Sequence, residues 1–314
     1  RGSKDAFGLK GTHMTTNPLI AVLGLGAMGL PMAARLAEKF SVRGFDIDPA
    51  RLEEGNKAGI EPASSARAAA QGADIVLLAV RNQEQLESSL YGDDGVAAVL
   101  GKGAVILLTS TVGIDAVRQV ADRLDADGLQ LVDAPISGGP ARAGDGDLLV
   151  TVGATDSAYS AAEDALQQLA STLVRMGNKA GDGQAMKTVN QLLCGVHIAA
   201  GAEALALAEA LGLDPELALN TLGAGAAASF MLADRGPRML QAYDEGGAEV
   251  RSRIDIFSKD MGIVNTAARA AGLATPIAAA AEGLYRIAEA HGQGAMDDSS
   301  VIKVMAPQRK GDAS

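Results

Sequence analysis

Short apolar runs alternate with amphipathic segments from residue 19 to about residue 176. The runs, such as LIAVLG, DIVLLAV and AVILLTS, have the length of buried strands, and the segments between them carry apolar residues at helical spacing. This alternation is typical of β-α-β units, in which helices cover both faces of a parallel sheet. The first part of the chain is therefore predicted to be a doubly wound α/β domain.

The sequence changes character from residue 183 onward. Long segments rich in Ala, Leu and Glu end at Gly or restart at Pro, which are stop and start signals of helices, and no strand pattern separates them. The polar, glycine-rich stretch 177–184 is the expected boundary. Residues 1–13 resemble a cloning remnant that ends before Met14. The predicted organisation is a remnant over 1–13, an α/β domain over 14–177 and an all-helical domain over 178–314.

The chain is acidic, with 38 Asp and Glu against 27 Lys and Arg and a formal charge of −11 at pH 7. Nucleic acids and anionic membrane surfaces are bound by clustered Lys and Arg, so this balance argues against both as partners. A small anionic substrate is not excluded, because one local positive site can bind it. The most apolar stretch, residues 192–211, has membrane-spanning length but contains His197 and two glutamates, so we expect a buried helix.

Cysteine and histidine are scarce. One cysteine and three histidines, one of them in residues 1–13, show no metal-ligand spacing, and we predict no metal site. Cys194 has no intramolecular partner for a disulfide, which is typical of a cytoplasmic protein, and its apolar surroundings favour an inert core thiol. We interpret His197 as a packed or interface residue.

A glycine pattern lies between the first expected strand and the first expected helix. In such G-x-G-x-x-G turns the glycines allow a tight turn, close approach of a pyrophosphate and close helix packing, while amides at the helix N-terminus bind the phosphates. Asp46 ends the second expected strand, 22 residues after Gly24, where a carboxylate accepts hydrogen bonds from the ribose hydroxyls and repels a 2′-phosphate. The pattern predicts a Rossmann domain that binds NAD. The turn residues assigned to the cofactor are Gly24, Leu25, Gly26, Ala27, Met28 and Gly29.

Two alternatives concern this motif. The glycines could form only a tight turn, with Asp46 capping or solvating the end of a strand, although the coincidence of context, spacing and acid favours the cofactor. Arg43 precedes the acid and Arg51 follows it, and either could accommodate a 2′-phosphate. The choice of NAD over NADP therefore depends on Asp46.

Four segments in chain order resemble the conserved blocks of a known family. They are GLGAMGLPMA near the N-terminus, DAPISGGPARAGDGDL at 133–148, GQAMKTVNQLL at 183–193 and FSKD at 257–260. The chain resembles the β-hydroxyacid dehydrogenases, which include 3-hydroxyisobutyrate dehydrogenase, tartronate semialdehyde reductase and 6-phosphogluconate dehydrogenase. The segments HIAAGAEALALA and MDDSSVIKVM resemble most the L-threonate dehydrogenase branch, which acts on four-carbon sugar acids.

The resemblance implies that Lys187 is the catalytic lysine, which takes the hydroxyl proton as hydride leaves the substrate. Burial near the cofactor would lower its pKa towards the working range. A solvated helix lysine is the ordinary alternative. Asn190 lies three residues later on the same helical face and would orient the same substrate, whereas a polar residue capping the core is its alternative.

The resemblance assigns Ser137, Gly138 and Gly139 to the substrate carboxylate, because backbone amides and a hydroxyl can converge on an anion at a strand end. A plain turn is the alternative for this segment. Asp260 would hold a lysine in place at the substrate, and Lys259 would reach the cofactor or the substrate, with a surface salt bridge as the ordinary alternative.

The resemblance also assigns Val80, at the end of DIVLLAV, and Thr111, in LLTSTV, to the cofactor. A helix N-cap role is open for Thr111 or for Ser110. These assignments place the nicotinamide in a cleft between the two domains.

Together these inferences predict NAD-dependent oxidation of a small anionic hydroxy acid, such as L-threonate to its 2-oxo acid. The rival substrates are 3-hydroxyisobutyrate and tartronate semialdehyde. A non-catalytic NAD-binding module and an imine reductase are rivals of other classes, and retention of Lys187 counts against both. The Ala-rich helices have more apolar surface than a small domain buries, which predicts a homodimer or homotetramer.

Overall fold

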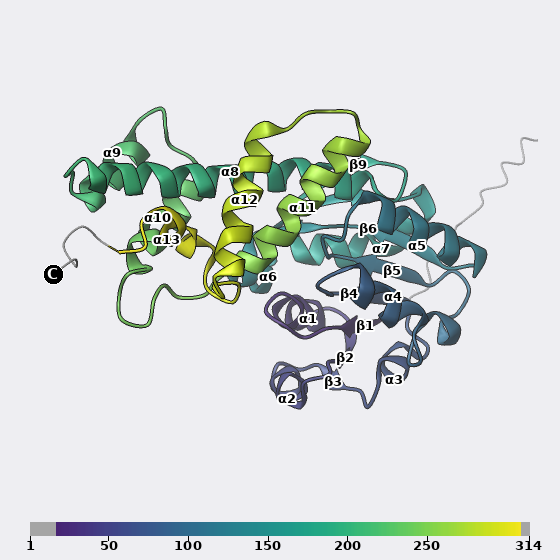
Figure 1. Ribbon diagram of the computed structural model, residues 1–314. Helices are drawn as coiled ribbons and strands as arrows, with labels where there is room; N and C mark the ends of the chain where they lie inside the picture. The colour runs from purple at the N-terminus through teal and green to yellow at the C-terminus, as the bar shows by residue number, and fades with distance from the viewer. Residues whose placement is uncertain (1–16, 309–314) are drawn as a thin grey trace, which may run out of the picture.

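The computed structural model describes residues 17–308. The predicted remnant over 1–13 and Met14 lie outside the described residues. Figure 1 shows a sheet covered by helices and a separate group of helices, which are joined by the long helix α8 (Asp182–Ala210). The predicted combination of a doubly wound α/β domain and an all-α domain is confirmed.

The strands of the first domain form one sheet in the order β3-β2-β1-β4-β5-β6-β8-β7, with β9 paired to β8. This order contains the 3-2-1-4-5-6 arrangement of dinucleotide-binding domains, with β1 next to β4 where the order reverses. β8 runs antiparallel to β6 and β7, which the alternation of strands and helices did not predict. The strands are β1 (Leu19–Leu23), β2 (Ser41–Phe45), β3 (Glu61–Pro62), β4 (Ile75–Leu78), β5 (Val105–Leu108), β6 (Gln130–Asp133), β7 (Ile136–Ser137), β8 (Leu148–Gly153) and β9 (Ala170–Gly177).

Helices pack on both faces of this sheet. They are α1 (Gly29–Ala37), α2 (Pro49–Lys57), α3 (Ala66–Ala70), α4 (Gln83–Tyr91), the 3-10 turn η1 (Ala97–Val99), α5 (Ile114–Ala126), α6 (Gly139–Asp145) and α7 (Asp156–Leu169). Alternate strand residues face opposite layers, so Ile20 and Val22 of β1 join the core beneath α1 and α7. Ala21 and Leu23 join the second core, beneath α3, α4 and α5. Both faces of β1 are thus buried, as the short apolar runs predicted.

Side chains that accept backbone hydrogen bonds determine where several of these helices begin. A side-chain oxygen at the N-cap satisfies an amide of the first turn that has no partner within the helix. The capping residues are Asp48 for α2, Ser65 for α3, Asn82 for α4 and Thr155 for α7.

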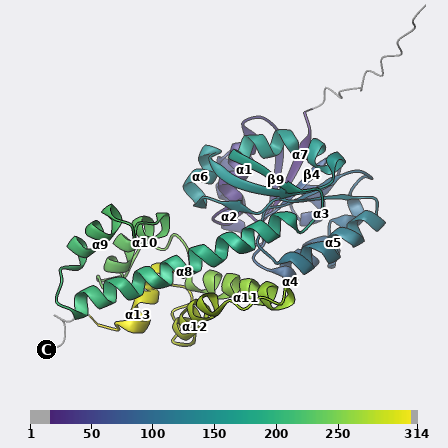
Figure 2. The same ribbon diagram turned by 90° about the horizontal axis from the view of Figure 1, so that it is seen from above.

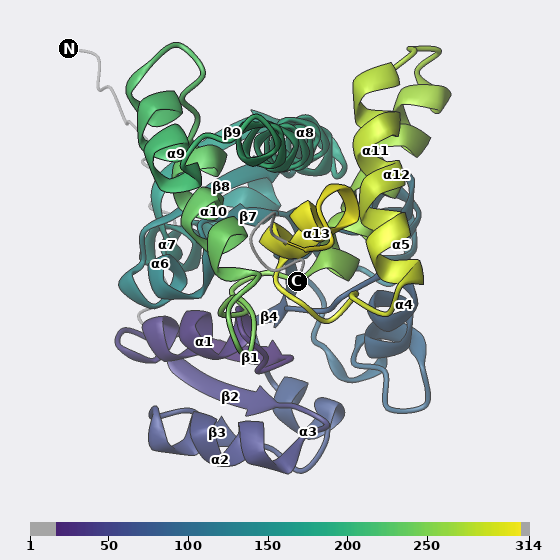
Figure 3. The same cartoon turned by 60° about the vertical axis from the view of Figure 1, so that its left-hand side comes forward.

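The second domain is built around α8. Its other helices are α9 (Pro215–Ala224), α10 (Phe230–Gln241), α11 (Ile254–Ala270), α12 (Pro276–Ala290), η2 (Asp298–Val301) and α13 (Ile302–Met305). α8 packs against α10, α11 and α12 and extends back to β8 and β9, as Figures 2 and 3 show. At Gly195 a Cβ atom would lie 2.3 Å from the sulfur of Met261, so the absence of a side chain lets α8 and α11 approach closely. Tyr285 of α12 donates a hydrogen bond to the Gly195 carbonyl at 2.8 Å.

α8 is, within residues 17–308, the helix that is long and apolar enough to cross a membrane by length and composition. In its most apolar window 44% of the residues are buried inside the protein. Ile198, Ala202 and Leu205 belong to the core of the second domain, whereas Leu193, Leu207 and Leu211 are exposed. The helix predicted to be buried over residues 192–211 is therefore buried on one face only.

Candidate active site

The three glycines of the turn between β1 and α1 have different surroundings. Gly24 has φ +92°, and a Cβ atom there would lie 2.5 Å from the Ala79 carbonyl oxygen. At Gly29 a Cβ atom would lie only 1.8 Å from the Gly24 carbonyl oxygen. At Gly26, by contrast, a Cβ atom would have no neighbour within 4 Å among the described residues. The fold itself therefore requires the first and third glycines, while the second leaves open space for a ligand.

The N-terminus of α1 faces the same turn. No side chain of the described residues caps this helix at Met28, and its first turn holds no acidic residue. Its amides are thus available to an anion, and the helix dipole favours negative charge there. Leu25 is buried, while Ala27 is exposed and Met28 half-buried. The turn therefore fits the diphosphate of a dinucleotide.

Asp46 lies directly after β2 and is half-buried. One carboxylate oxygen accepts a hydrogen bond from the Leu25 amide at 2.7 Å, and the other accepts one from the Asp48 amide at 2.9 Å. Asp46 thus joins the end of β2 to the glycine turn. A carboxylate oxygen has more than one lone pair, so the same group retains capacity to accept from a ribose hydroxyl.

Lys187 lies in the first turns of α8, and its side chain reaches the end of β7. The ammonium nitrogen donates a hydrogen bond to the Ser137 hydroxyl at 2.9 Å. Lys187 is 8% exposed, so a solvated helix lysine does not describe it. Burial lowers the pKa of Lys187; Asp260 and Cys194 act in the opposite direction, and Lys259 adds to the lowering. A lowered pKa makes the neutral amine, which can accept a proton, available at lower pH than in a solvated lysine.

Gly138 and Gly139 follow Ser137 and begin α6. Their φ angles are +146° and +79°, so both adopt backbone conformations that favour glycine. A Cβ atom at Gly138 would lie 2.9 Å from a methyl carbon of Leu148, whereas one at Gly139 would meet no described atom within 4 Å. The segment is thus a turn, and it has open space beside Gly139.

Asn190 is connected to Asp260 through side chains on one face of α8. Its amide donates to the Gln191 side-chain oxygen at 3.0 Å and to the Cys194 sulfur at 3.5 Å. The Gln191 amide in turn donates to Asp260 Oδ2 at 2.5 Å. The Lys259 ammonium lies 3.0 Å from Asp260 Oδ1, outside hydrogen-bonding geometry. These residues form a polar chain beside Lys187 that joins α8 to α11.

Lys259 connects the second domain to the carboxyl ends of the central strands of the sheet. Its ammonium donates hydrogen bonds to the carbonyl of Thr111 at 2.9 Å and to that of Arg81 at 3.3 Å. These two carbonyls belong to the loops that follow β5 and β4, where the carboxyl ends of the central strands meet. Lys259 therefore reaches the loops predicted to contact the cofactor.

A serine side chain links the two loops. The Val80 amide donates to the Ser110 hydroxyl at 2.8 Å. The N-cap of α5 is Gly113, without a side-chain hydrogen bond from the described residues, so neither Ser110 nor Thr111 caps this helix. The alternative N-cap role for these residues is therefore wrong.

Sequence reasoning missed two buried residues of the site, Asp133 and Gln184. Asp133 Oδ2 accepts the amides of Gly181 and Gln184, both at 2.9 Å, and its Oδ1 accepts the Gln184 side-chain amide at 2.9 Å. Burial raises the pKa of Asp133 to about 6, although these hydrogen bonds act against the shift. Both residues lie in segments that resemble family blocks, but no local pattern pairs residues so far apart in the chain.

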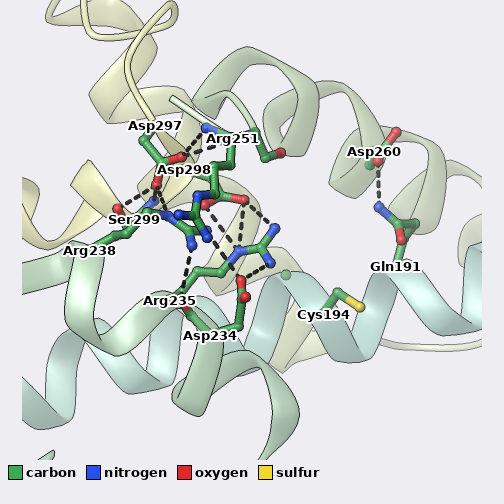
Figure 4. A network of polar contacts seen from close by, with 12 residues as sticks. Gln191, Cys194, Asp234, Arg235, Arg238, Arg251, Asp260, Asp297, Asp298 and Ser299 are labelled. Atoms are coloured by element: carbon green, nitrogen blue, oxygen red, sulfur yellow. Dashed lines mark hydrogen bonds and ion pairs between the residues drawn. The ribbon is translucent and has the colours of Figure 1, made fainter. Parts of the chain in front are cut away.

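A second buried polar cluster lies deeper in the helical domain (Figure 4). The Arg238 guanidinium pairs with Asp297 at 3.1 Å, and that of Arg235 pairs with Asp298 at 3.0 Å. Asp234 contacts both arginines. In Figure 4 this cluster lies apart from the contact between Gln191 and Asp260. It joins α10 to η2 and the loop before it.

Cys194 and His197 are both half-buried. Burial raises the pKa of the Cys194 thiol, which disfavours the reactive thiolate. Within residues 17–308 no group of three His, Cys, Asp or Glu side chains is arranged to hold a metal ion.

Two family models match consecutive parts of the chain. The model described as the NAD binding domain of 6-phosphogluconate dehydrogenase matches residues 19–177. The model described as NAD-binding of NADP-dependent 3-hydroxyisobutyrate dehydrogenase matches residues 181–305.

Individual proteins match over nearly the whole chain. The L-threonate dehydrogenase of Cupriavidus necator is 38% identical, covering 91% of this chain and 95% of that protein. The 3-hydroxyisobutyrate dehydrogenase of Pseudomonas aeruginosa is 32% identical, covering 91% and 97%. The crystal structure of 3-hydroxyisobutyrate dehydrogenase from Salmonella typhimurium aligns with a TM-score of 0.84 at 33% identity, covering 92% of this chain and 100% of that chain.

The strand order and the glycine turn after β1 define a dinucleotide-binding domain, which α8 joins here to a helical domain. The chain belongs to the β-hydroxyacid dehydrogenase family. It is an NAD-dependent hydroxyacid dehydrogenase whose substrate is a small hydroxy acid, as the resemblance implied.

Proposed function

We propose that this protein oxidises a four-carbon sugar acid, L-threonate, to its 2-oxo acid with NAD in the cytoplasm. The observation that carries the proposal is the buried ammonium of Lys187, 2.9 Å from the Ser137 hydroxyl at the edge of the sheet. The similarity to L-threonate dehydrogenases over 91% of the chain supports the choice of substrate.

In this reaction neutral Lys187 accepts the proton of the substrate hydroxyl. Bound NAD supplies the acceptor for the hydride that leaves the same carbon. The C–H and O–H bonds of the alcohol break, a carbonyl forms, and the proton stays on the Lys187 nitrogen. The lowered pKa of Lys187 makes the neutral amine available at lower pH than for a solvated lysine.

The substrate carboxylate is held by Ser137 and by the amides of Gly138 and Gly139. The hydrogen bond that Ser137 accepts from Lys187 leaves its hydroxyl proton free to be donated. Asn190 orients the substrate from the same face of α8. Asp260 holds Lys259 at the site, at 3.0 Å, and completes the set of substrate residues.

Asp46 selects NAD over NADP. Its carboxylate is held at the turn by the Leu25 amide and repels a 2′-phosphate. The two nearby arginines are engaged elsewhere: Arg43 contacts Glu61 at 3.4 Å, and Arg51 contacts Glu54 at 2.7 Å. Both guanidinium groups thus already have carboxylate partners in this structure. Val80 and Thr111 complete the cofactor site at the loops after β4 and β5.

We propose that residues 14–177 form the domain that binds the cofactor. Residues 178–314 form the domain that binds the substrate and mediates assembly. Large apolar side chains are exposed at the far end of α8 and on α9 and α10, and a second copy of the chain would cover them. The most exposed are Leu207 (59%), Leu211 (70%), Leu217 (67%) and Phe230 (72%). We therefore propose a homodimer or homotetramer built through the helical domain.

A substrate panel tests the proposed reaction. NADH formation is followed at 340 nm with L-threonate, D-threonate, D-erythronate, 3-hydroxyisobutyrate, glycerate and 6-phosphogluconate, each with NAD and with NADP. Turnover of L-threonate with NAD is the expected result. Turnover of 3-hydroxyisobutyrate alone would favour the second candidate, which the match to the Salmonella structure supports. If no acid of the panel gave NADH formation while the protein still bound added NADH, a non-catalytic NAD-binding module would be favoured.

Lys187→Met tests the role of the amine. We expect NADH affinity to be retained and turnover to be lost, with Lys57→Met, at an exposed ion pair with Glu53, as the control. In the wild type, oxidation should rise with pH as Lys187 becomes neutral, and reduction should fall over the same range. Equal loss of NADH binding and turnover would show instead that Lys187 is structural.

We expect Lys187→Met to keep or gain thermal stability although it loses turnover. Because the folded-state pKa of Lys187 is lowered, the folded protein binds fewer protons than the unfolded chain between that pKa and the ordinary value. Its stability therefore rises with pH across that window. Lys187→Met removes the buried ammonium, so its melting temperature at neutral pH should equal or exceed that of the wild type.

A further inference from the structure

Three segments of the chain meet at the Gln184 side chain, which is fully buried. Its amide nitrogen donates to the Ser110 carbonyl and to Asp133 Oδ1, both at 2.9 Å. Its oxygen accepts the amides of Val112 at 3.0 Å and Gly113 at 3.2 Å. The loop after β5, the end of β6 and the start of α8 are thus joined through one side chain.

The donors and acceptors around Gln184 allow only one orientation of its side-chain amide. If the Gln184 amide were flipped, its nitrogen would face the Val112 and Gly113 amides and its oxygen would face the Ser110 carbonyl. Each of these contacts would pair two donors or two acceptors. Asp133 must likewise be an acceptor at both oxygens, because its partners are three N–H groups.

The start of α8 is also packed tightly against the sheet. A Cβ atom at Gly183 would lie 2.6 Å from the Asp133 carbonyl oxygen and 2.7 Å from that of Thr151. At Gly153, on β8, a Cβ atom would lie 2.8 Å from the Gly183 nitrogen. Backbone therefore contacts backbone here, and the helix start has little freedom to shift.

We propose that Asp133 and Gln184 are positioning residues, which place Lys187 against Ser137 and against the cofactor loop at Thr111. The inference rests on the proposed role of Lys187 as the base. Lys187 lies three residues after Gln184, less than one helical turn. A displacement of the helix start is thus passed directly to the ammonium, and misplacement by about 1 Å can cost about 100-fold in rate.

An effect of Asp133 on the position of Lys187 can be distinguished from an effect on the pKa of Lys187. The groups that shift the pKa of Lys187 are Asp260, Cys194 and Lys259, in addition to burial, and Asp133 is not one of them. Loss of turnover on neutralising Asp133, with the pH profile of oxidation unchanged, would therefore come through geometry.

The test is Asp133→Asn, which keeps the shape of the side chain. When the new amide nitrogen replaces Oδ1, it faces the Gln184 side-chain N–H group, so two donors meet. Asp297→Asn is the matched control, because Asp297 is equally buried and its Oδ2 also accepts two backbone amides, those of Arg251 and Ser252. The readouts are kcat and KM for L-threonate, the deuterium isotope effect with L-threonate labelled at C2, and hydrogen exchange of peptides over residues 181–190.

We expect Asp133→Asn to lower kcat about 10- to 100-fold with a smaller change in KM, and to raise the isotope effect as hydride transfer becomes rate-limiting. Amide exchange should increase over residues 181–190. Asp297→Asn should lower the melting temperature without these changes. Wild-type kcat in folded Asp133→Asn, or the same exchange pattern in both variants, would overturn the proposal.

A second pair of variants covers failure of Asp133→Asn to fold. Gln184→Glu sets a carboxylate oxygen against Asp133 and the Ser110 carbonyl, whereas the double variant Asp133→Asn/Gln184→Glu restores a donor–acceptor pair between positions 133 and 184. The double variant should be more active than Gln184→Glu, and no recovery would count against positioning. If the wild type oxidises none of the acids, the proposed function fails, but localised exchange over 181–190 still decides whether the network holds α8.

Discussion

Replacing the second glycine of the cofactor turn should separate ligand binding from stability. A methyl group at Gly26 would have no neighbour within 4 Å among the described residues, and Gly26 does not have a positive φ. Gly26→Ala should therefore fold normally. Reduced freedom of the unfolded chain should add about 0.4–1 kcal/mol of stability, which raises the melting temperature by about 1–4 °C.

The same methyl group would occupy the space through which a diphosphate approaches the turn. Losing one hydrogen bond to a charged phosphate costs about 1.5–3 kcal/mol, which corresponds to about 10- to 100-fold in the dissociation constant of NADH. Gly29→Ala is the matched control with the opposite outcome. Its Cβ atom would lie 1.8 Å from the Gly24 carbonyl oxygen, so the backbone must move. We expect a cost of about 3 kcal/mol or more and a melting temperature lower by roughly 6–12 °C.

Two measurements decide this prediction: fluorescence titration with NADH, and thermal unfolding followed by circular dichroism. Gly26→Ala should lose affinity for NADH while its melting temperature rises slightly, whereas Gly29→Ala should lose stability in the absence of any ligand. If Gly26→Ala bound NADH like the wild type, or unfolded as early as Gly29→Ala, the assignment of the open space at Gly26 to the diphosphate would be refuted.

Two further predictions concern cofactor choice and assembly. Asp46→Asn keeps an oxygen for the Leu25 amide but removes the charge that repels a 2′-phosphate. The ratio of kcat/KM with NADP to kcat/KM with NAD should therefore rise about tenfold or more, where tenfold corresponds to about 1.4 kcal/mol. An unchanged ratio would contradict the role of Asp46. Phe230→Glu places a charge on a side chain that is 72% exposed in a single chain, and light scattering should show a lower mass than for the wild type. A wild-type mass for this variant would exclude α10 from the interface.

The fold was predictable because its signals are local. Apolar runs of strand length, glycine at tight turns and Pro or Gly at helix ends each act within a few residues, and they identified β1, α1, β2 and the change to helices at α8. The antiparallel β8 was not predictable from such signals. A strand buried on both faces has the same apolar pattern in either direction, and its direction is set by the preceding connection, here the short helix α6.

The places of Gly24 in the turn after β1 and of Asp46 at the end of β2 were predictable, because a motif fixes their spacing along the chain. Contacts between distant residues have no such signature. Asp133 and Gln184 are 51 residues apart, and Arg238 and Asp297 are 59 residues apart. A buried carboxylate resembles a surface carboxylate in sequence, because the partner that compensates its burial is chosen by the fold.

Burial, more than any single neighbouring charge, governs the proton affinity of Lys187. Asp260 would by itself raise the pKa of Lys187, but Lys259 stands 3.0 Å from that carboxylate and acts in the opposite direction. Gln191 holds the other oxygen of Asp260, so the carboxylate is fixed between Gln191 and Lys259. The surroundings of the Lys187 amine therefore come from both domains: α8 supplies the lysine, α11 supplies Asp260 and Lys259, and Ser137 at the end of β7 contacts the amine.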